Sequence, residues 1–298
     1  MLWIPFTLFA AFMQAWRNAF QKQLSQDLGA TSVTLARFIL AGPIAALYLW
    51  GLYYWQPSQP LPHFTDSHTS YVFTAYIVGA ALCQIAATAL MVRLFQLRNY
   101  AVGVGLAKSE AIWAAILGVA FFGTLLSPLG WMGVVIGSLA VGLLSGMRQV
   151  TGQVSPKTLL LGVASGLSFA LTSLWVREAS LLLELDFPFS AAWVLLLVIS
   201  LQTLLLVSWL GIRDPASLTG LIKRPALTAL VSLTSCLGSI GWFSAMSLES
   251  VALVKTLGQV EVLFTLLIST YYFKVTLARQ DKWGLALIVI AALCVMWA

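Results

Sequence analysis

The chain has 298 residues, of which 60% are hydrophobic and only 9% are charged, and its net charge is +6. Soluble domains carry about 25% charged residues, so this composition excludes an ordinary water-soluble protein and indicates a polytopic membrane protein. The lysines and arginines are scattered over many connections, which argues against a nucleic-acid partner and for a lipid bilayer.

Ten apolar stretches, of about 16 to 25 residues, are interpreted as helices that cross a bilayer. The first one lacks a basic leader and a small-residue cleavage site, so we interpret it as a permanent span. The predicted fold class is an all-α polytopic membrane protein with ten transmembrane helices. In chain order, the predicted spans are 3–21, 32–54, 70–94, 101–122, 129–147, 158–179, 189–210, 226–247, 251–273 and 283–298.

The two halves of the chain resemble each other. Placing Glu110 on Glu261 also brings Phe122 onto Phe273 without a gap. An odd number of spans per half forces the two copies into opposite orientations, and inverted repeats are typical of transporters whose substrate site lies between them. Under this symmetry, Glu110 and Glu261 are expected to be partners. The predicted domains are two inverted five-helix repeats, residues 1–150 and 151–298.

Several features together resemble the drug/metabolite transporter superfamily of the EamA type. They are the five-plus-five layout, a glutamate in the fourth span of each half, a later aromatic residue, and Trp131 or Trp283 opening the fifth span. The sequence departs from the family pattern at Ala111 and Val262, where a proline commonly follows the glutamate. The resemblance implies a secondary transporter that exports a small metabolite, an amino acid or a related amphipathic or charged compound, by alternating access.

Enzymatic motifs are missing from the sequence. It has no His-Glu-x-x-His, Gly-x-Ser-x-Gly, Walker or dinucleotide-binding pattern, so we predict that the chain is not an enzyme and needs no cofactor. His63 and His68 share the 56–69 connection without a cysteine or second acidic ligand beside them, so no metal site is expected. The alternative function is a lipid carrier of the scramblase type, or a structural membrane partner that transports no solute.

Four charged residues interrupt apolar sequence: Lys108 and Glu110 in the fourth span, and Lys255 and Glu261 in the ninth. A charge at the bilayer centre costs about 3 kcal/mol, so each must be paired or line a polar cavity. Helical geometry turns each lysine away from the glutamate of its own helix, so the partners must come from other spans. The glutamates either orient helices as structural ion-pair members or face the transport path. The candidate partners are Arg17, Arg37 and Arg93.

We predict a cavity in which polar and charged groups, together with aromatic faces, bind an amphipathic small molecule. Packing within the membrane is the alternative role of the tryptophans. A buried glutamate can bind an amino group or take up a proton, so a proton is the candidate coupling ion. The candidate substrate-binding residues are Glu110, Glu261, Lys255, Gln259, Lys108, Arg17, Gln14, Trp16, Asn18, Gln84, Trp175 and Trp242.

Loop charges predict the orientation. The basic residues of the connections follow the odd-numbered spans. They are Lys22, Arg98, Arg148, Lys157, Arg213, Lys223, Arg224, Lys274, Arg279 and Lys282. Lysine and arginine in short loops mark the cytoplasmic side, so both termini are predicted to be periplasmic in a bacterial inner membrane, whereas the resemblance alone implies termini inside. Small-xxx-small runs such as Gly133–Gly137 and Gly162–Gly166 predict that spans five and six pack closely. Both a monomer and a homodimer remain open.

Overall fold

The computed structural model describes residues 1–64, 66–97, 105–144, 155–271 and 279–298. These residues form helices joined by turns and loops, and no β-strand occurs among them. The helices are α1 (Trp3–Leu24), α2 (Ala30–Phe38), α3 (Ala41–Trp55), α4 (Ser67–Phe95), α6 (Glu110–Phe121), α7 (Pro128–Leu144), α8 (Pro156–Leu182), α9 (Phe189–Arg213), α10 (Pro215–Ile222), α11 (Pro225–Leu248), α12 (Val251–Leu257), α13 (Glu261–Tyr271) and α14 (Arg279–Met296).

Six helical segments of the described chain are long and apolar enough to cross a membrane. Two further apolar helices, Pro128–Leu144 and Trp283–Met296, are shorter, so ten spans remain a prediction. The parts of the predicted spans at 101–104, 145–147 and 272–273 lie outside the described residues. The six segments are Ala30–Trp55, Ser67–Phe95, Pro156–Leu182, Phe189–Arg213, Pro225–Leu248 and Val251–Ile268.

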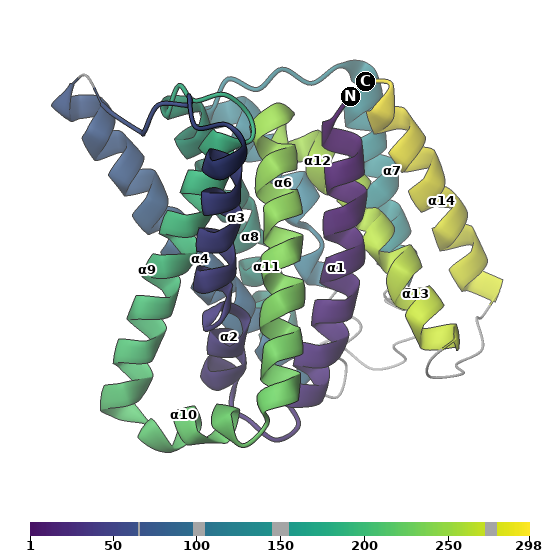
Figure 1. The fold of residues 1–298 in the computed structure, drawn as a ribbon. Helices are drawn as coiled ribbons and strands as arrows, with labels where there is room; N and C mark the ends of the chain where they lie inside the picture. Colours follow the sequence, from purple (N-terminus) through teal and green to yellow (C-terminus); the bar gives the residue numbers. More distant parts are fainter. Residues whose placement is uncertain (65, 98–104, 145–154, 272–278) are drawn as a thin grey trace.

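The predicted second span is divided into α2 and α3 at Ile39 and Leu40. Pro43 explains the break, because proline has no N–H to donate to the carbonyl of Ile39 and its ring clashes with that carbonyl. The short helix α10, between α9 and α11, was not predicted from the sequence. It runs across one end of the molecule (Figure 1).

The predicted fourth and ninth spans are both interrupted beside their glutamates. Lys108 and Ser109 form a turn whose N–H groups bond three residues back, and α6 then begins at Glu110. In the ninth span, α12 ends in the 3₁₀ turn Gly258–Val260, and α13 begins at Glu261. Each glutamate is therefore the first residue of a new helix, where the partial positive charge of the helix N-terminus favours a carboxylate.

Helices of the first half pack against helices of the second half. The most extensive pairs are α4 with α8, α1 with α11, and α7 with α14. Figure 1 shows α1 and α11 side by side near the middle of the molecule and α14 beside α7. The helices that follow the two breaks contact members of these pairs: α6 contacts α8, and α13 contacts α1. The breaks therefore lie beside the packed helix pairs.

The glycine runs do not join the fifth and sixth spans as predicted. A methyl group on Gly133 of α7 would meet the side chain of Cys294 and the carbonyl of Ala291, so this run packs on α14. A methyl group on Gly166 of α8 would lie 2.9 Å from the carbonyl oxygen of Ala107 and 2.6 Å from Oγ of Ser109. Gly166 therefore lets α8 approach the break before α6.

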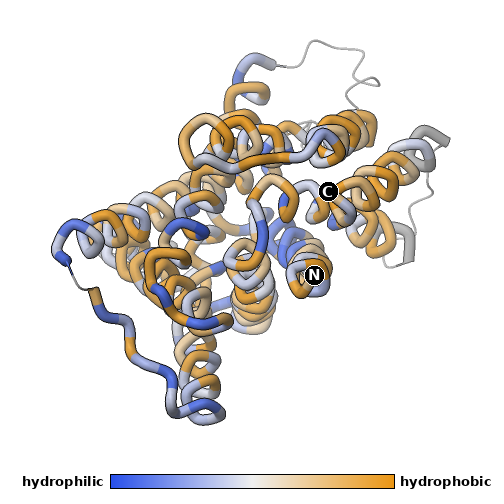
Figure 2. The backbone as a smooth tube through the Cα atoms, turned by 90° about the horizontal axis from the view of Figure 1, so that it is seen from above, coloured by the Kyte–Doolittle hydropathy of each residue, from blue (hydrophilic) through white to orange (hydrophobic). Residues whose placement is uncertain are grey.

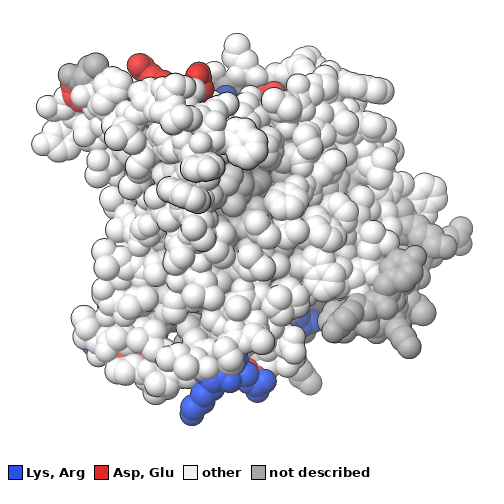
Figure 3. All heavy atoms as spheres, in the orientation of Figure 1, with Lys and Arg blue, Asp and Glu red and all other residues white. Residues whose placement is uncertain are grey.

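Large apolar side chains cover much of the outer surface, among them Leu47, Leu160, Leu204 and Ile212. Apolar surface on this scale suits contact with lipid. Figure 2 shows mostly hydrophobic helices, with hydrophilic stretches on connections such as the one between α3 and α4. In Figure 3, acidic side chains gather at one end of the visible face and basic side chains at the other.

Candidate functional site

Two ion pairs join the interrupted helices of the two halves. The Lys108 ammonium binds the Glu261 carboxylate, and Nζ of Lys255 lies 3.7 Å from Oε2 of Glu110. All four side chains are buried. As expected from helical geometry, neither lysine pairs with the glutamate of its own span. Glu110 and Glu261, the expected partners under the repeat symmetry, do not bind each other; each carboxylate binds the lysine of the opposite half.

The Glu261 carboxylate has further partners on α1. Nε2 of Gln14 donates to Oε2, and Nδ2 of Asn18 donates to Oε1 at 2.6 Å. Each carboxylate oxygen therefore accepts at least one hydrogen bond, as a buried charge requires. These bonds fix α1 to the start of α13.

Trp242 of α11 connects the two ion pairs. The Lys255 ammonium lies 4.3 Å from the centroid of a Trp242 ring, which is within the range of a cation–π contact. The indole Nε1 of Trp242 donates to Oε1 of Gln14 at 2.9 Å, while the amide nitrogen of Gln14 binds Glu261. A chain of contacts therefore runs from Glu110 through Lys255, Trp242 and Gln14 to Glu261.

Two buried arginines lie beside this chain and bind neutral groups. Arg17 donates to the Asn18 side-chain oxygen at 2.9 Å, and Arg37 donates to the hydroxyls of Ser235 at 2.9 Å and Thr88 at 2.8 Å. Arg17 is 3% exposed and Arg37 is 2% exposed. No described carboxylate lies within ion-pair distance of either guanidinium. The expectation that an arginine partners a glutamate was therefore wrong for these two side chains.

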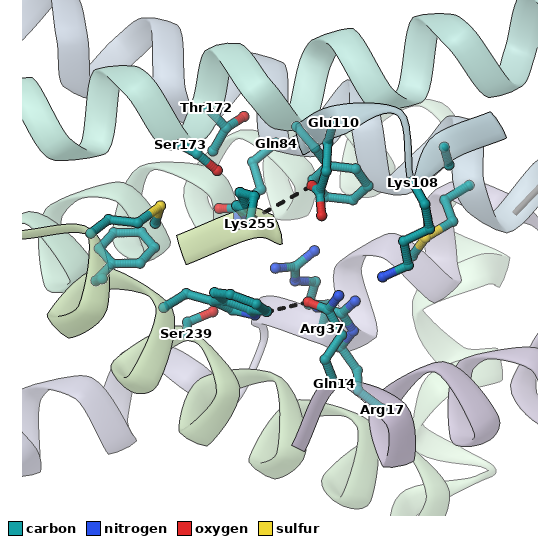
Figure 4. Close-up of a pocket in the computed structure, with 16 residues that line it drawn as sticks. Gln14, Arg17, Arg37, Gln84, Lys108, Glu110, Thr172, Ser173, Ser239 and Lys255 are labelled. Atoms are coloured by element: carbon teal, nitrogen blue, oxygen red, sulfur yellow. Dashed lines mark hydrogen bonds and ion pairs between the residues drawn. The ribbon is translucent and has the colours of Figure 1, made fainter. Parts of the chain in front are cut away.

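A small cavity of about 30 Å³ opens among these side chains. Since a water molecule needs roughly 10 to 15 Å³ of such space, the cavity admits about two waters and no metabolite. Figure 4 shows Glu110, Thr172, Ser173 and Gln84 on one side and Arg37, Gln14, Arg17 and Ser239 on the other. The cavity is lined by Gln14, Arg17, Arg37, Gln84, Met91, Ala107, Lys108, Glu110, Phe169, Thr172, Ser173, Ser239, Trp242, Phe243, Met246 and Lys255.

Seven of the predicted site residues line this cavity: Gln14, Arg17, Gln84, Lys108, Glu110, Trp242 and Lys255. Glu261 and Asn18 do not line it, although they belong to the hydrogen-bond network beside it. Trp16 stacks on Phe20 within α1, and Trp175 packs against Gly79 of α4. The structure thus places these two tryptophans outside the cavity.

Gln259 is buried in the 3₁₀ turn but does not line the cavity. Its side chain lies against Gly137 of α7, and neither of its amide atoms has a hydrogen-bond partner among the described residues. Gln84, by contrast, lines the cavity and accepts a bond from Nε2 of Gln202 at 2.6 Å.

Sequence reasoning missed the hydroxyl groups of the cavity, Thr172, Ser173 and Ser239. Serine and threonine are common in membrane helices, and their positions carry no distinguishing signal in one sequence. Within the part of the chain that the structure describes, no group of three His, Cys, Asp or Glu residues could hold a metal ion.

The comparisons with known proteins agree with this architecture. Residues 156–297 match the model of the EamA-like transporter family. No curated protein matches the chain significantly. A solved crystal structure is 14% identical, with a TM-score of 0.68, and the match covers 98% of this chain and 96% of that one. At this identity the likeness shows the fold alone, and it extends over both halves of the chain.

The EamA match lies within the second predicted repeat and confirms the resemblance seen in the sequence. EamA-like proteins are a transporter family and not an enzyme family, and the apolar helices agree with a multi-pass membrane protein. Residues 156–297 therefore form an EamA-like transporter region, which places this part of the chain in the drug/metabolite transporter superfamily.

Proposed function

We propose that this protein is a secondary transporter that moves a small metabolite across the bacterial inner membrane by alternating access, with export as its direction. One observation carries the proposal: two interrupted helices, one from each half, place their glutamates on lysines of the opposite half beside a polar cavity. Helices interrupted near the midplane, at the interface between repeats, are how many transporters build a substrate site.

We also propose ten spans in two inverted five-helix repeats, residues 1–150 and 151–298. The helix contacts support this, because exchanging equivalent spans converts the most extensive contacts between the halves into one another. The exchange puts the sixth span in the place of the first and the third span in the place of the eighth. The contact between α1 and α11 then becomes the contact between α8 and α4. The contact of α6 with α8 becomes that of α13 with α1 in the same way.

The ion pairs suggest how transport is coupled to movement. Both pairs cross between the halves, so a rocking motion of one half against the other must stretch or exchange them. We assign the small cavity to an occluded conformation of this cycle, since a metabolite needs more space than about 30 Å³. Protonation of Glu261 would release Lys108, which makes a proton our candidate coupling ion.

We further propose that both termini are periplasmic. Met1 and Ala298 line a common pocket, at the same end of the molecule as the connection carrying the exposed Glu184 and Asp186. The exposed Lys223 and Arg224 lie at the other end, beside α10. This distribution fits a basic cytoplasmic face. Arg148 and two other residues that carried the prediction, Arg98 and Lys274, lie outside the described residues.

The decisive experiment is counterflow in proteoliposomes with labelled amino acids, organic acids and amines. Glu261→Gln alone would leave the Lys108 ammonium buried without a carboxylate, so it also perturbs stability. We therefore pair it with Lys108→Met. The double variant is expected to fold and to lose at least about tenfold in transport, which corresponds to roughly 1.4 kcal/mol.

The matched control is Asp27→Asn, which removes the exposed ion pair with Arg224 and should transport normally. Transport at the wild-type rate in the double variant would remove the pair from the mechanism. Lipid scrambling measured in the same vesicles separates the alternative function, since a scramblase would move labelled lipid without any solute counterflow.

A further inference from the structure

Among the residues that the structure describes, the charges around the cavity do not balance. Four cationic side chains, Arg17, Arg37, Lys108 and Lys255, lie along it, against the two carboxylates of the ion pairs, giving a net charge of +2. Each carboxylate is already bound by a lysine. The unbalanced charge therefore resides on the two arginines.

Protonation cannot remove this charge, because an arginine side chain stays protonated in proteins. Both guanidiniums are nearly completely buried, and their hydrogen bonds go to an amide and to hydroxyls, which carry no charge. Part of each guanidinium is left over by the described residues: Nη1 of Arg17 and Nη2 of Arg37 donate to none of them. Both arginines line the cavity, so we expect these N–H groups to be available to a ligand there.

A buried cation without a counter-charge is unfavourable in a membrane protein unless something supplies that charge. We propose that the transported substrate supplies it, and that the cavity takes a small organic anion whose carboxylate or phosphate binds Arg17 and Arg37. The inference rests on the proposed transport function and names its substrate class. Guanidinium forks suit both groups, because each offers oxygens for two parallel hydrogen bonds.

The remaining lining indicates an anion with an apolar body. Met91, Phe169, Phe243 and Met246 line the cavity beside the polar groups. Such a surface favours an organic acid over a hydrated inorganic ion. The amino-group recognition considered from the sequence is less suited to this site, because both carboxylates already hold ammonium groups of the protein. Because the cavity is small, the anion must enter when the two halves part.

The test measures binding to the purified full-length protein by thermal unfolding and calorimetry, with probes of similar size and different charge. Benzoate and phenyl phosphate are the anions, phenylalanine is the zwitterion, benzylamine is the cation, and chloride is the inorganic control. We expect one or both organic anions to raise the unfolding temperature in a concentration-dependent way and benzylamine to have no effect. The stronger of the two identifies carboxylate or phosphate as the preferred group.

Arg17→Gln and Arg37→Gln should each weaken binding of that anion at least tenfold, and Arg37→Lys should recover only part of the loss. Arg213→Gln, which alters an exposed arginine beside Trp209, is the matched control and should bind normally. If an arginine variant does not fold, the selectivity of the wild-type protein for anions over benzylamine decides the matter by itself.

The outcomes separate this inference from the proposed function. Counterflow of amines or zwitterions that organic anions neither drive nor inhibit would overturn the anion site and leave transport intact. Anion binding that depends on both arginines, without counterflow of any solute, would uphold the site and overturn the transport function. Stabilisation by chloride alone would overturn the inference, because the missing charge would then be a structural counterion.

Discussion

Lys108 and Glu261 form a buried ion pair although they lie 153 positions apart, and the Lys255–Glu110 pair crosses the same interface in the opposite direction. Each glutamate opens a helix after an interruption of its span. The two pairs therefore link the interruptions of the two spans, where the regular α-helical hydrogen bonding gives way to tighter turns. This gives them a structural role that can be measured separately from transport.

Removing one member of the buried pair should be more harmful than removing both. Lys108→Met or Glu261→Gln alone is expected to lower the free energy of unfolding by about 3 to 5 kcal/mol, because each leaves an unpaired buried charge. The double variant should lose much less, since both charges disappear together. Thermal unfolding of the purified proteins ranks their stabilities. A double variant that is less stable than both single variants would contradict this prediction.

Gln259 should be less stabilising than a side chain without polar atoms. Both of its amide atoms are buried without a partner, which costs about 1 to 3 kcal/mol, so Gln259→Met is expected to raise the unfolding temperature. Gln84→Met provides the comparison, because the Gln84 oxygen accepts a bond from Gln202 and its loss should destabilise the protein. Equal effects of the two substitutions would show that the Gln259 amide is satisfied in solution.

Gly166→Ala is expected to lower the free energy of unfolding by about 1 to 3 kcal/mol, because the added methyl group would press on the turn before α6. Gly51→Ala is the matched change in α3, where nothing lies within 4 Å of an added methyl group, and it should be neutral or slightly stabilising. Unfolding in detergent measures both. A neutral Gly166→Ala would mean that α8 does not approach the turn this closely.

The orientation can be checked with reporters fused after Ala298 in a bacterial host. Because the exposed Lys223 and Arg224 lie beside α10, at the end opposite to the termini, we expect an active periplasmic phosphatase and a dark cytoplasmic fluorescent protein. A fusion after Arg213, beside α10 at the basic end, should give the reverse pattern. A fluorescent protein that is bright after Ala298 and dark after Arg213 would show that the orientation is the opposite of the one we propose.

The helical, membrane-spanning character of the chain followed from composition and apolar length. Only helices and closed barrels satisfy backbone hydrogen bonds inside a bilayer, and long continuous apolar runs are typical of helices. The positions of the interruptions did not follow. Pro43 is a visible signal for the break between α2 and α3, but no proline lies near Lys108, and glycine at position 258 is unremarkable in a membrane helix. These two breaks depend on contacts between the halves.

The charged part of the site was also predictable in kind but not in detail. The high cost of a charge in the membrane identified Lys108, Glu110, Lys255 and Glu261, and helical geometry excluded pairing within one span. Which residues pair across the molecule depends on how the halves pack. For the same reason Arg37 was expected to partner a carboxylate, whereas it binds two hydroxyls.

The crossed ion pairs set a condition on synthesis. At translation rates of about 5 to 20 residues per second, Glu261 leaves the ribosome roughly 8 to 30 s after Lys108. During that interval the first half must enter the membrane with Lys108 and Glu110 both lacking their final partners. Water at the insertion site or neighbouring membrane components must solvate these charges until the second half arrives. A ribosome that stalls midway would release a fragment in which both charges lack their partners. Such a fragment is well suited to recognition by quality-control proteases.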